Sequence, residues 1–290
     1  MKLQTFSIVA GSSACNARCP FCISKMTPLN GITPKLPDIN LRNFRKAALL
    51  AKQLGAYTAM ITGKGEPTMY PDQISSYLGA LEEFEFPLVE LQTNGILLYE
   101  QKEKYQEYLK KWFDSGLTTI AVSIVHYDAE KNRENYLPYK KQYIDLPELI
   151  RSLHSIGYCV RLACILADGY IDDVNKLEHL IAFAKQHKVE QLTLRPVNRP
   201  EQSKDVAAAD WFEHHFLKPE QKKQFEQFFS QKGHPLMRFE YGAAIYDING
   251  QNVCFTNSLT LDADRDIRQL IFFPEGRVRY DWQYEGAVML

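Results

Sequence analysis

Short apolar runs alternate with helical segments over most of the chain. Runs rich in β-branched and aromatic residues predict six strands, at residues 6–10, 57–62, 88–92, 118–125, 158–166 and 190–197. The segments between them predict helices near residues 41–55, 72–84, 100–114, 146–156 and 172–187. Strands that alternate with helices of this length predict right-handed βαβ units and a parallel sheet.

Residues at the predicted helix ends support this alternation. Gly55, Gly116 and Gly157 each lie between a helix and the next strand, where a helix C-cap favours glycine. Asp172 and Asp173 begin a helix, where carboxylates suit the free N–H groups and the helix dipole. Six βα units are too few for a closed eight-stranded barrel. The expected fold is therefore α/β, a partial (β/α)6 TIM-like barrel with its functional groups in the loops that follow the strands.

Two stretches depart from this pattern. Residues 126–143 are polar and rich in tyrosine, and they predict a long loop that is either a lid over a substrate or a plain surface loop. After residue 233 the sequence predicts strands and hairpins, with turns at 249–250 and 274–276. We therefore expect a barrel core at 1–233 and a C-terminal β-hairpin extension at 234–290 that packs on the barrel.

Composition limits the classes of function. The chain has 290 residues, 45% of them hydrophobic and 24% charged, as is typical of a soluble globular protein. A formal net charge of −1 counts against a broad nucleic-acid or membrane-surface interface. We recognise neither a signal peptide nor an apolar run of about 18 residues, so no membrane association is expected. Six cysteines, three of them clustered, do not suggest a disulfide framework, and a reducing cytoplasm is the expected location.

The cluster Cys15, Cys19 and Cys22 follows the first predicted strand. Thiolates four and three residues apart can converge on one metal centre. Structural zinc normally takes four ligands in two pairs, and the sequence has no second pair. Cys159 and Cys164 are five residues apart on a predicted strand and point to opposite faces. Three thiolates that leave one position open suit an iron–sulfur cluster with a reactive iron.

The Cys-x3-Cys-x2-Cys spacing, with the aromatic Phe21 before the last cysteine, resembles the radical S-adenosylmethionine (radical SAM) superfamily. The resemblance implies that Cys15, Cys19 and Cys22 hold a [4Fe-4S] cluster whose fourth iron binds SAM. One electron, from a donor such as flavodoxin or ferredoxin, would cleave SAM to a 5′-deoxyadenosyl radical. That radical would abstract hydrogen from a small-molecule substrate, while the protein positions the groups and excludes water.

Further segments carry the same resemblance. Gly63, Gly65, Glu66 and Pro67 match the family's GxGEP segment, whose backbone and glutamate bind the SAM ammonium group, and Lys64 occupies the variable position. Other candidate SAM contacts follow later strands, with Ser123 matching a ribose contact, Arg161 suiting the SAM carboxylate, and Thr93 and Asn94 offering hydrogen bonds. A simple turn or a structural ion pair would also explain some of these residues.

Residues 160–187 resemble the fifth unit of the enzymes around the molybdopterin-pathway GTP cyclase. Two departures matter. The cyclase pattern favours asparagine near Ala163 or Cys164, and it carries three further C-terminal cysteines for a second cluster. Only Cys254 stands in that region of this chain, so no second cluster is expected.

Convergent arginines favour a phosphate or carboxylate ligand. The candidates for substrate binding are Arg195, Arg199, Arg277 and Arg279. They favour a small anionic, nucleotide-like substrate, and an RNA- or peptide-modifying enzyme is the alternative within the family. Hypotheses of another class are a non-catalytic iron–sulfur electron carrier or redox sensor and a zinc-bound structural module.

Overall fold

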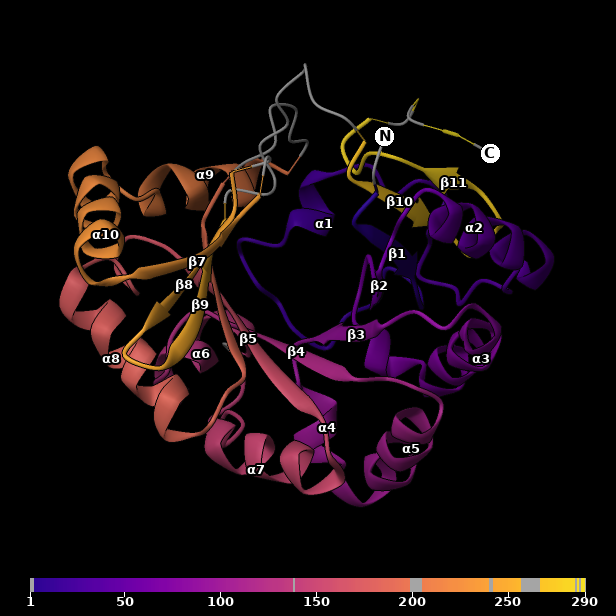
Figure 1. The fold of residues 1–290 in the computed structure, drawn as a ribbon, viewed down its shortest axis with the longest axis horizontal. Coiled ribbons are helices and arrows are strands. Elements are labelled where there is room, and N and C mark those ends of the chain that lie inside the picture. The colour runs from indigo at the N-terminus through magenta and orange to yellow at the C-terminus, as the bar shows by residue number, and fades with distance from the viewer. Residues whose placement is uncertain are drawn as a thin grey trace.

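Six parallel strands form the centre of the computed structural model, which describes residues 3–137, 139–198, 205–239, 242–256, 267–284, 286, 288 and 289. They lie side by side in chain order as β1 (Thr5–Val9), β2 (Thr58–Thr62), β3 (Leu88–Thr93), β4 (Thr119–Ile124), β5 (Cys159–Leu166) and β6 (Gln191–Pro196). Figure 1 shows this sheet curving around an open centre with helices on its outer side. The predicted partial barrel is confirmed.

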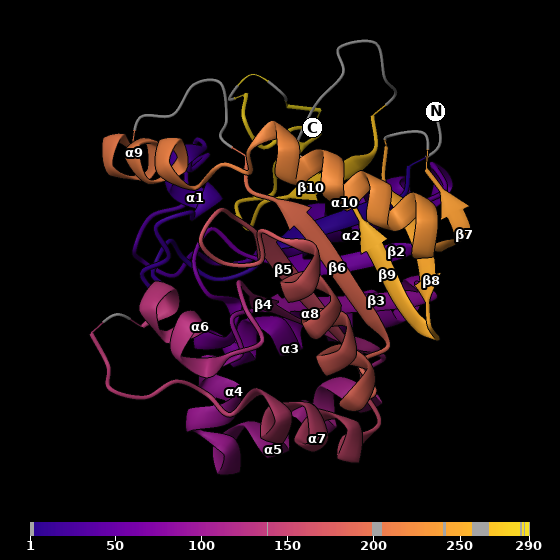
Figure 2. The same ribbon diagram turned by 90° about the vertical axis from the view of Figure 1, so that its left-hand side faces the viewer.

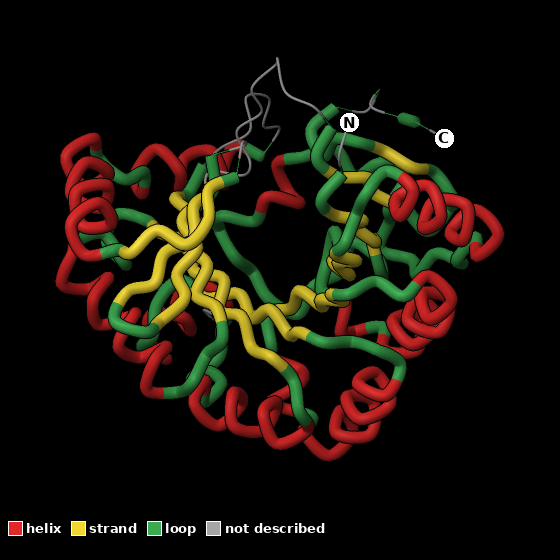
Figure 3. The backbone as a smooth tube through the Cα atoms, in the orientation of Figure 1, coloured by secondary structure: helices red, strands yellow, loops and turns green. Residues whose placement is uncertain are grey.

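The outer layer consists of the helices that the sequence predicted. They are α2 (Leu41–Gln53), α3 (Pro71–Leu81), α5 (Lys102–Asp114), α7 (Leu146–Ile156) and α8 (Val174–Gln186), and Figure 3 shows them outside the strands. Asp145 and Asp173 each cap a helix by accepting a backbone N–H, and Gly157 ends α7 with φ at 115°.

Side chains on β5 show how the two faces of the sheet differ. Val160, Leu162, Cys164 and Leu166 are buried in the core beneath the helices, whereas Arg161 and its alternate neighbours are partly exposed. Cys159 is exposed and Cys164 is buried, which agrees with the prediction that they point to opposite faces of the strand. The concave face of the sheet therefore remains accessible to solvent.

The chain after residue 233 continues this sheet at both edges. β10 (Gln269–Phe272) pairs in parallel with β1 and carries the short β11 (Val278–Arg279). At the other edge, β9 (Gln251–Phe255) pairs in parallel with β6, followed by β8 (Ala244–Ile248) and β7 (His234–Arg238). The turns predicted at 249–250 and 274–276 are present, the second as a turn at 274–275 followed by a bend at Gly276. The division into two domains stays a prediction.

Several elements were not predicted, including one helix of 14 residues. They are α1 (Ile23–Met26), α4 (Ile96–Glu100), α6 (Ala129–Tyr136), α9 (Val206–His215), α10 (Pro219–Lys232) and the 3-10 turns η1 (Pro67–Met69) and η2 (Glu82–Phe84). Figure 2 shows α9 beside α1 at the same end of the barrel. The expectation of an uninterrupted loop over 126–143 was wrong. Asp128 caps α6, and Asn132 Oδ1 accepts the backbone N–H groups of Val125 and His126, which together stabilise a helix there.

In the described part of the chain, no helix combines the length and the apolar character needed to cross a bilayer.

Candidate functional site

Three free thiols lie on the loop between β1 and α1, at Cys15, Cys19 and Cys22. This is the C-terminal end of a parallel strand, where αβ barrels place their functional groups. Figure 1 shows the loop running across the open centre of the barrel. Cys22 is also the residue from which α1 starts, so the third thiol is attached directly to a helical turn.

The three thiols influence one another. Burial raises the pKa of Cys15 to about 11, and nearby Cys22 adds to the rise. Burial also raises the pKa of Cys19 well above its usual range, with further contributions from Cys22 and Cys15. Three thiolates in one place therefore require a positive partner. Iron supplies that charge, and thiolates are its usual ligands in iron–sulfur clusters.

Other groups beside the thiols are consistent with a cluster. Among the described residues, no group of three His, Cys, Asp or Glu side chains converges on one metal ion. A four-iron cluster does not require three side chains to converge on one ion, because each thiolate would bind a different iron atom. The Asn16 Nδ2 atom is buried and has no hydrogen-bond partner in the described structure, so a donor is available beside Cys15. The donor set fits a [4Fe-4S] cluster.

The glycine loop after β2 packs directly against the cysteine loop. A Cβ atom on Gly65 would lie 1.9 Å from the Ala14 carbonyl oxygen, and one on Gly63 would lie 2.9 Å from that of Ala10. The Glu66 N–H donates to the Ala14 carbonyl at 3.0 Å. The two glycines thus permit a close approach between two protein loops. Their contact with SAM stays a prediction.

Glu66 ties together the loops that follow β2 and β3. Its Oε1 atom accepts from the Thr68 N–H at 3.0 Å and from the hydroxyls of Thr68 and Thr93, both at 2.6 Å. Its Oε2 atom accepts from the Asn94 N–H at 2.9 Å. Burial raises the pKa of the carboxyl, and these donors act in the opposite direction. Pro67 follows as the first residue of η1.

Asn94 links β3 to the cysteine loop. Its Nδ2 atom donates to Asn16 Oδ1 at 2.7 Å and lies 4.0 Å from Cys15 Sγ. Its Oδ1 atom accepts from the Ile96 N–H at 3.0 Å, which begins α4. The sequence selected Asn94 as a SAM contact, which stays a prediction, and the structure places it next to Cys15, one of the three predicted cluster ligands.

Phe21 holds the cysteine loop against two helices. Its ring lies 5.8 Å from that of Tyr136 on α6 and 5.4 Å from that of Trp211 on α9. The Arg18 N–H also donates to the Tyr136 carbonyl at 3.0 Å. These packing partners were not recognised in the sequence, because neither helix was predicted.

Ser123 and Arg161 lie on the concave face, on neighbouring strands. Ser123 is level with Ala163, and Arg161 is level with Ala121, two residues earlier along the paired strands. The Arg161 guanidinium forms an ion pair with Glu90 and donates to Thr193 Oγ1 at 3.4 Å. The structural ion pair considered for Arg161 is therefore present, and its contact with SAM stays a prediction.

The four arginines proposed for the substrate have different environments. Arg195 is partly exposed on the concave face, level with Ile165 near the end of β6. Arg279 is buried on β11, whereas Arg277 precedes that strand and is exposed, so the two do not share a surface. Arg199 lies outside the described residues.

Lys64 was noted only as the variable residue of the glycine loop. Its side chain is buried and donates to Thr27 Oγ1 at 2.9 Å. The ammonium lies 5.2 Å from the centre of the Trp282 ring. Burial, opposed by Cys22 and reinforced by Arg279, lowers the pKa of Lys64 to about 8. A charged residue between two glycines was the one sequence signal for it.

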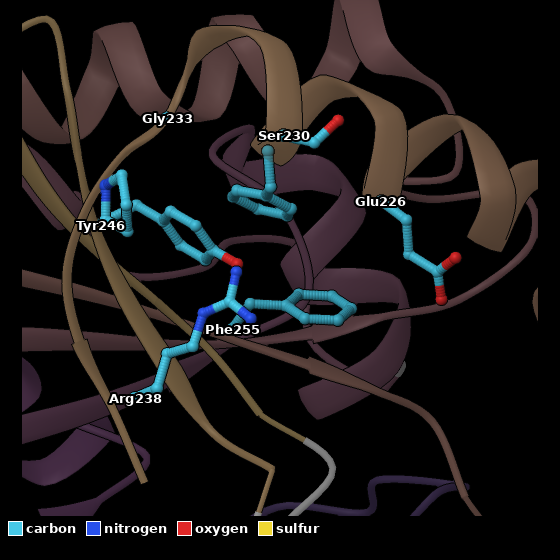
Figure 4. A pocket seen from close by; sticks show the side chains of 8 residues that line it. Glu226, Ser230, Gly233, Arg238, Tyr246 and Phe255 are labelled. Carbon is cyan, nitrogen blue, oxygen red and sulfur yellow. The ribbon is translucent and has the colours of Figure 1, made fainter.

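A cavity of about 300 Å³ lies elsewhere, between α10 and strands β7–β9. Figure 4 shows Glu226 and Arg238 on opposite sides of a set of aromatic rings. Phe229 lies 5.1 Å from both Tyr246 and Phe255. None of the predicted site residues lines this cavity.

Comparisons with known proteins agree with the site. A family profile described as the radical SAM superfamily matches residues 9–181. A GTP 3′,8-cyclase from Aeromonas hydrophila is 24% identical over 182 residues, 62% of this chain and 50% of that protein. A probable GTP 3′,8-cyclase from Archaeoglobus fulgidus is 35% identical over 125 residues, 43% of this chain and 37% of that protein.

Solved structures support the fold. Streptococcus suis SuiB bound to S-adenosylmethionine superposes with a TM-score of 0.61 at 16% identity, covering 96% of this chain and 60% of that one. The chain spans half the length or less of the two cyclases described above. Because the family match covers more than half of the chain, the protein belongs to the radical SAM superfamily, whose members use a [4Fe-4S] cluster and S-adenosylmethionine.

Proposed function

We propose that this protein uses a cluster and SAM to abstract hydrogen from a small anionic, nucleotide-like substrate. The observation that carries the proposal is the direct packing of the three-thiol loop on the glycine loop, through the Glu66 N–H and the Ala14 carbonyl. The bound groups would supply one-electron cleavage of SAM. The chain's own task is to bind, orient and exclude water.

Each loop has a separate part in this proposal. Cys15, Cys19 and Cys22 would hold the cluster, and Asn94 would orient Cys15 through the contact at 4.0 Å. Glu66 would keep the loops after β2 and β3 in register through its buried hydrogen bonds. Ser123 lies on the accessible concave face, where it would meet the ribose of SAM.

Two observations support an anionic substrate. Arg195 lies partly exposed on the concave face near the end of β6. Relatives in two organisms carry the name GTP 3′,8-cyclase, and GTP is a small anionic nucleotide. We also propose a cytoplasmic location and a low-potential electron donor such as flavodoxin or ferredoxin, and no nucleic-acid partner.

The test uses protein purified and reconstituted without oxygen. Dithionite and SAM are added, and 5′-deoxyadenosine is measured by mass spectrometry. The wild type should form it, and Cys22→Ala should not, whereas Cys159→Ala, which changes an exposed cysteine at the start of β5, should retain formation. Deuterated nucleotides then test the substrate class, with label expected in the 5′-deoxyadenosine.

Other outcomes assign other functions. An intact cluster with no 5′-deoxyadenosine in any condition would favour an electron carrier or redox sensor. Zinc without iron would contradict the mechanism. Product formation with label transferred only from a peptide or RNA would retain SAM cleavage and contradict the nucleotide-like substrate.

A further inference from the structure

Lys64 places a positive charge beside the cysteine loop. Its anchor, Thr27, is the C-cap residue of α1, and α1 starts from Cys22. The Thr27 hydroxyl donates to the Ile23 carbonyl at 2.9 Å, which leaves its lone pairs directed to the Lys64 ammonium. The single turn of α1 therefore connects Thr27, which accepts the hydrogen bond from Lys64, to Cys22.

This ammonium is shielded from solvent, since Lys64 as a residue is only 5% exposed. Trp282, from the segment after β11, covers it at 5.2 Å. Among the residues that the structure describes, the groups that act on the Lys64 charge are Cys22, which favours it, and Arg279, which opposes it, and no described carboxylate is among them. A buried ammonium without an acidic partner costs free energy unless another negative charge lies close.

We propose that Lys64 is the counter-charge of the iron–sulfur cluster and raises the potential at which the cluster accepts an electron. The inference rests on the proposed function, because it requires the cluster that Cys15, Cys19 and Cys22 would hold. Each thiolate brings one negative charge, and a one-electron donor adds another. A fixed positive charge in a poorly solvated position stabilises the more negative state, because water screens it little.

The C-terminal segment has a role in this arrangement. Trp282 packs on Phe273 at 6.1 Å, and with it belongs to a small apolar cluster around Val9 and Ile271. Trp282 of this cluster lies over the Lys64 ammonium, which donates to Thr27 at the end of α1. The segment after β11 would thus act on the redox chemistry of the barrel although it provides no ligand.

The experiment is a potentiometric titration of reconstituted protein, without SAM or substrate, followed by the electron paramagnetic resonance signal of the reduced cluster. Lys64→Met should lower the equilibrium constant for one-electron reduction about tenfold, which is ~59 mV. Lys64→Arg keeps the charge and should stay close to the wild type. Lys25→Met is the matched control, because Lys25 also lies beside the loop, 3.5 Å from the Cys19 carbonyl, but is exposed. Solvent screening should make its shift much smaller.

Equal potentials in Lys64→Met and the wild type, with full iron and sulfide content, would overturn the proposal. So would equal shifts in Lys64→Met and Lys25→Met. If Lys64→Met does not retain a cluster, Lys64→Gln decides, since it removes the charge and keeps a polar donor for Thr27. A lower potential supports the proposal, and an unchanged one overturns it. Wild-type protein that binds no cluster would contradict the proposed function as well, which separates the two failures.

Discussion

At the scale of single residues, Glu66 shows why a buried acid occurs in a loop. Both of its oxygens accept hydrogen bonds, from Thr68, Thr93 and Asn94. Hydrogen bonds to a charged group stabilise more than neutral ones, and a donor left unpaired in the interior costs about 1–3 kcal/mol. The carboxylate therefore determines how the loops that follow β2 and β3 meet.

Glu66→Gln should destabilise the protein by about 1–3 kcal/mol, because an amide NH2 would face N–H and O–H donors. Urea unfolding measures the change. Glu83→Gln is the control, since the Glu83 carboxylate pairs with Arg45 at the surface and such pairs contribute about 1 kcal/mol or less. Equal losses in the two variants would show that Glu66 has no special structural role.

Two glycines give opposite expectations. Gly65→Ala should destabilise the protein by about 1–3 kcal/mol and reduce the iron bound per chain, because the new Cβ would lie 1.9 Å from the Ala14 carbonyl oxygen. Gly79 lies within α3, and a Cβ atom there would have no neighbour within 4 Å, so Gly79→Ala should stabilise the helix by about 0.5–1 kcal/mol. Urea unfolding and iron analysis distinguish them. A tolerated Gly65→Ala would mean that the loops separate readily.

At the scale of elements, α6 connects β4 to the cysteine loop. His126, three residues before α6 begins, is buried, and its Nδ1 atom accepts from the N–H of the N-cap residue Asp128 at 2.9 Å, so the neutral ring is required there. The end of α6 reaches the cysteine loop through the Tyr136 carbonyl, which accepts from Arg18. The beginning of this helix therefore influences where the cysteines lie.

The His126 environment predicts a pH dependence. Burial lowers the pKa of His126 in the folded protein, so the unfolded chain binds the proton first as pH falls. The stability that the neutral ring contributes is present above pH ~6.5 and is lost as the pH drops below that value. His126→Asn should flatten the dependence of the unfolding free energy between about pH 7.5 and about pH 5.5.

His234→Asn is the control, since His234 is exposed on β7. It should leave the pH dependence as in the wild type. If the unfolding free energy of His126→Asn depends on pH as steeply as that of the wild type, another group causes the pH dependence.

At the scale of the whole molecule, strands from the C-terminal segment complete both edges of the barrel sheet. Phe272 of β10 is fully buried, with its ring 5.1 Å from that of Phe44 and 6.3 Å from that of Tyr77. Its neighbour Gln269 accepts from Ser7 on β1 at 3.1 Å, across 262 positions of the chain. The edge of the barrel that carries the cysteine loop is thus supported by residues from the far end of the sequence.

Phe272→Ala should cost about 3–5 kcal/mol, because it leaves a cavity shared by β10, α2 and α3. Tyr280→Ala, in the same segment but 41% exposed, should cost less than about 1 kcal/mol. Urea unfolding followed by circular dichroism and by tryptophan fluorescence should give coincident curves if the C-terminal strands and the barrel unfold together. A Phe272→Ala variant as stable as the wild type would show that β10 is dispensable to the barrel.

Local signals predicted the barrel well. The six strands and five outer helices follow from runs of apolar residues, capping aspartates and terminal glycines, which act within a few residues of the chain. The helix α6 was missed because its sequence, from Ala129 to Tyr136, is mostly polar. Its stability comes from the Asp128 cap and from Asn132 bonding back to Val125 and His126, which no hydrophobic pattern reveals.

The αβ alternation, the three-cysteine loop and the glycine loop could all be predicted from the sequence, because each depends on residues close together in the chain. The groups that surround those loops could not, because they come together only when the chain folds. Folding pairs Arg161 with Glu90, joins β10 to β1, and places Lys64 between Thr27 and Trp282. Such contacts join residues far apart in the chain, and burial makes them strong because water no longer screens the charges.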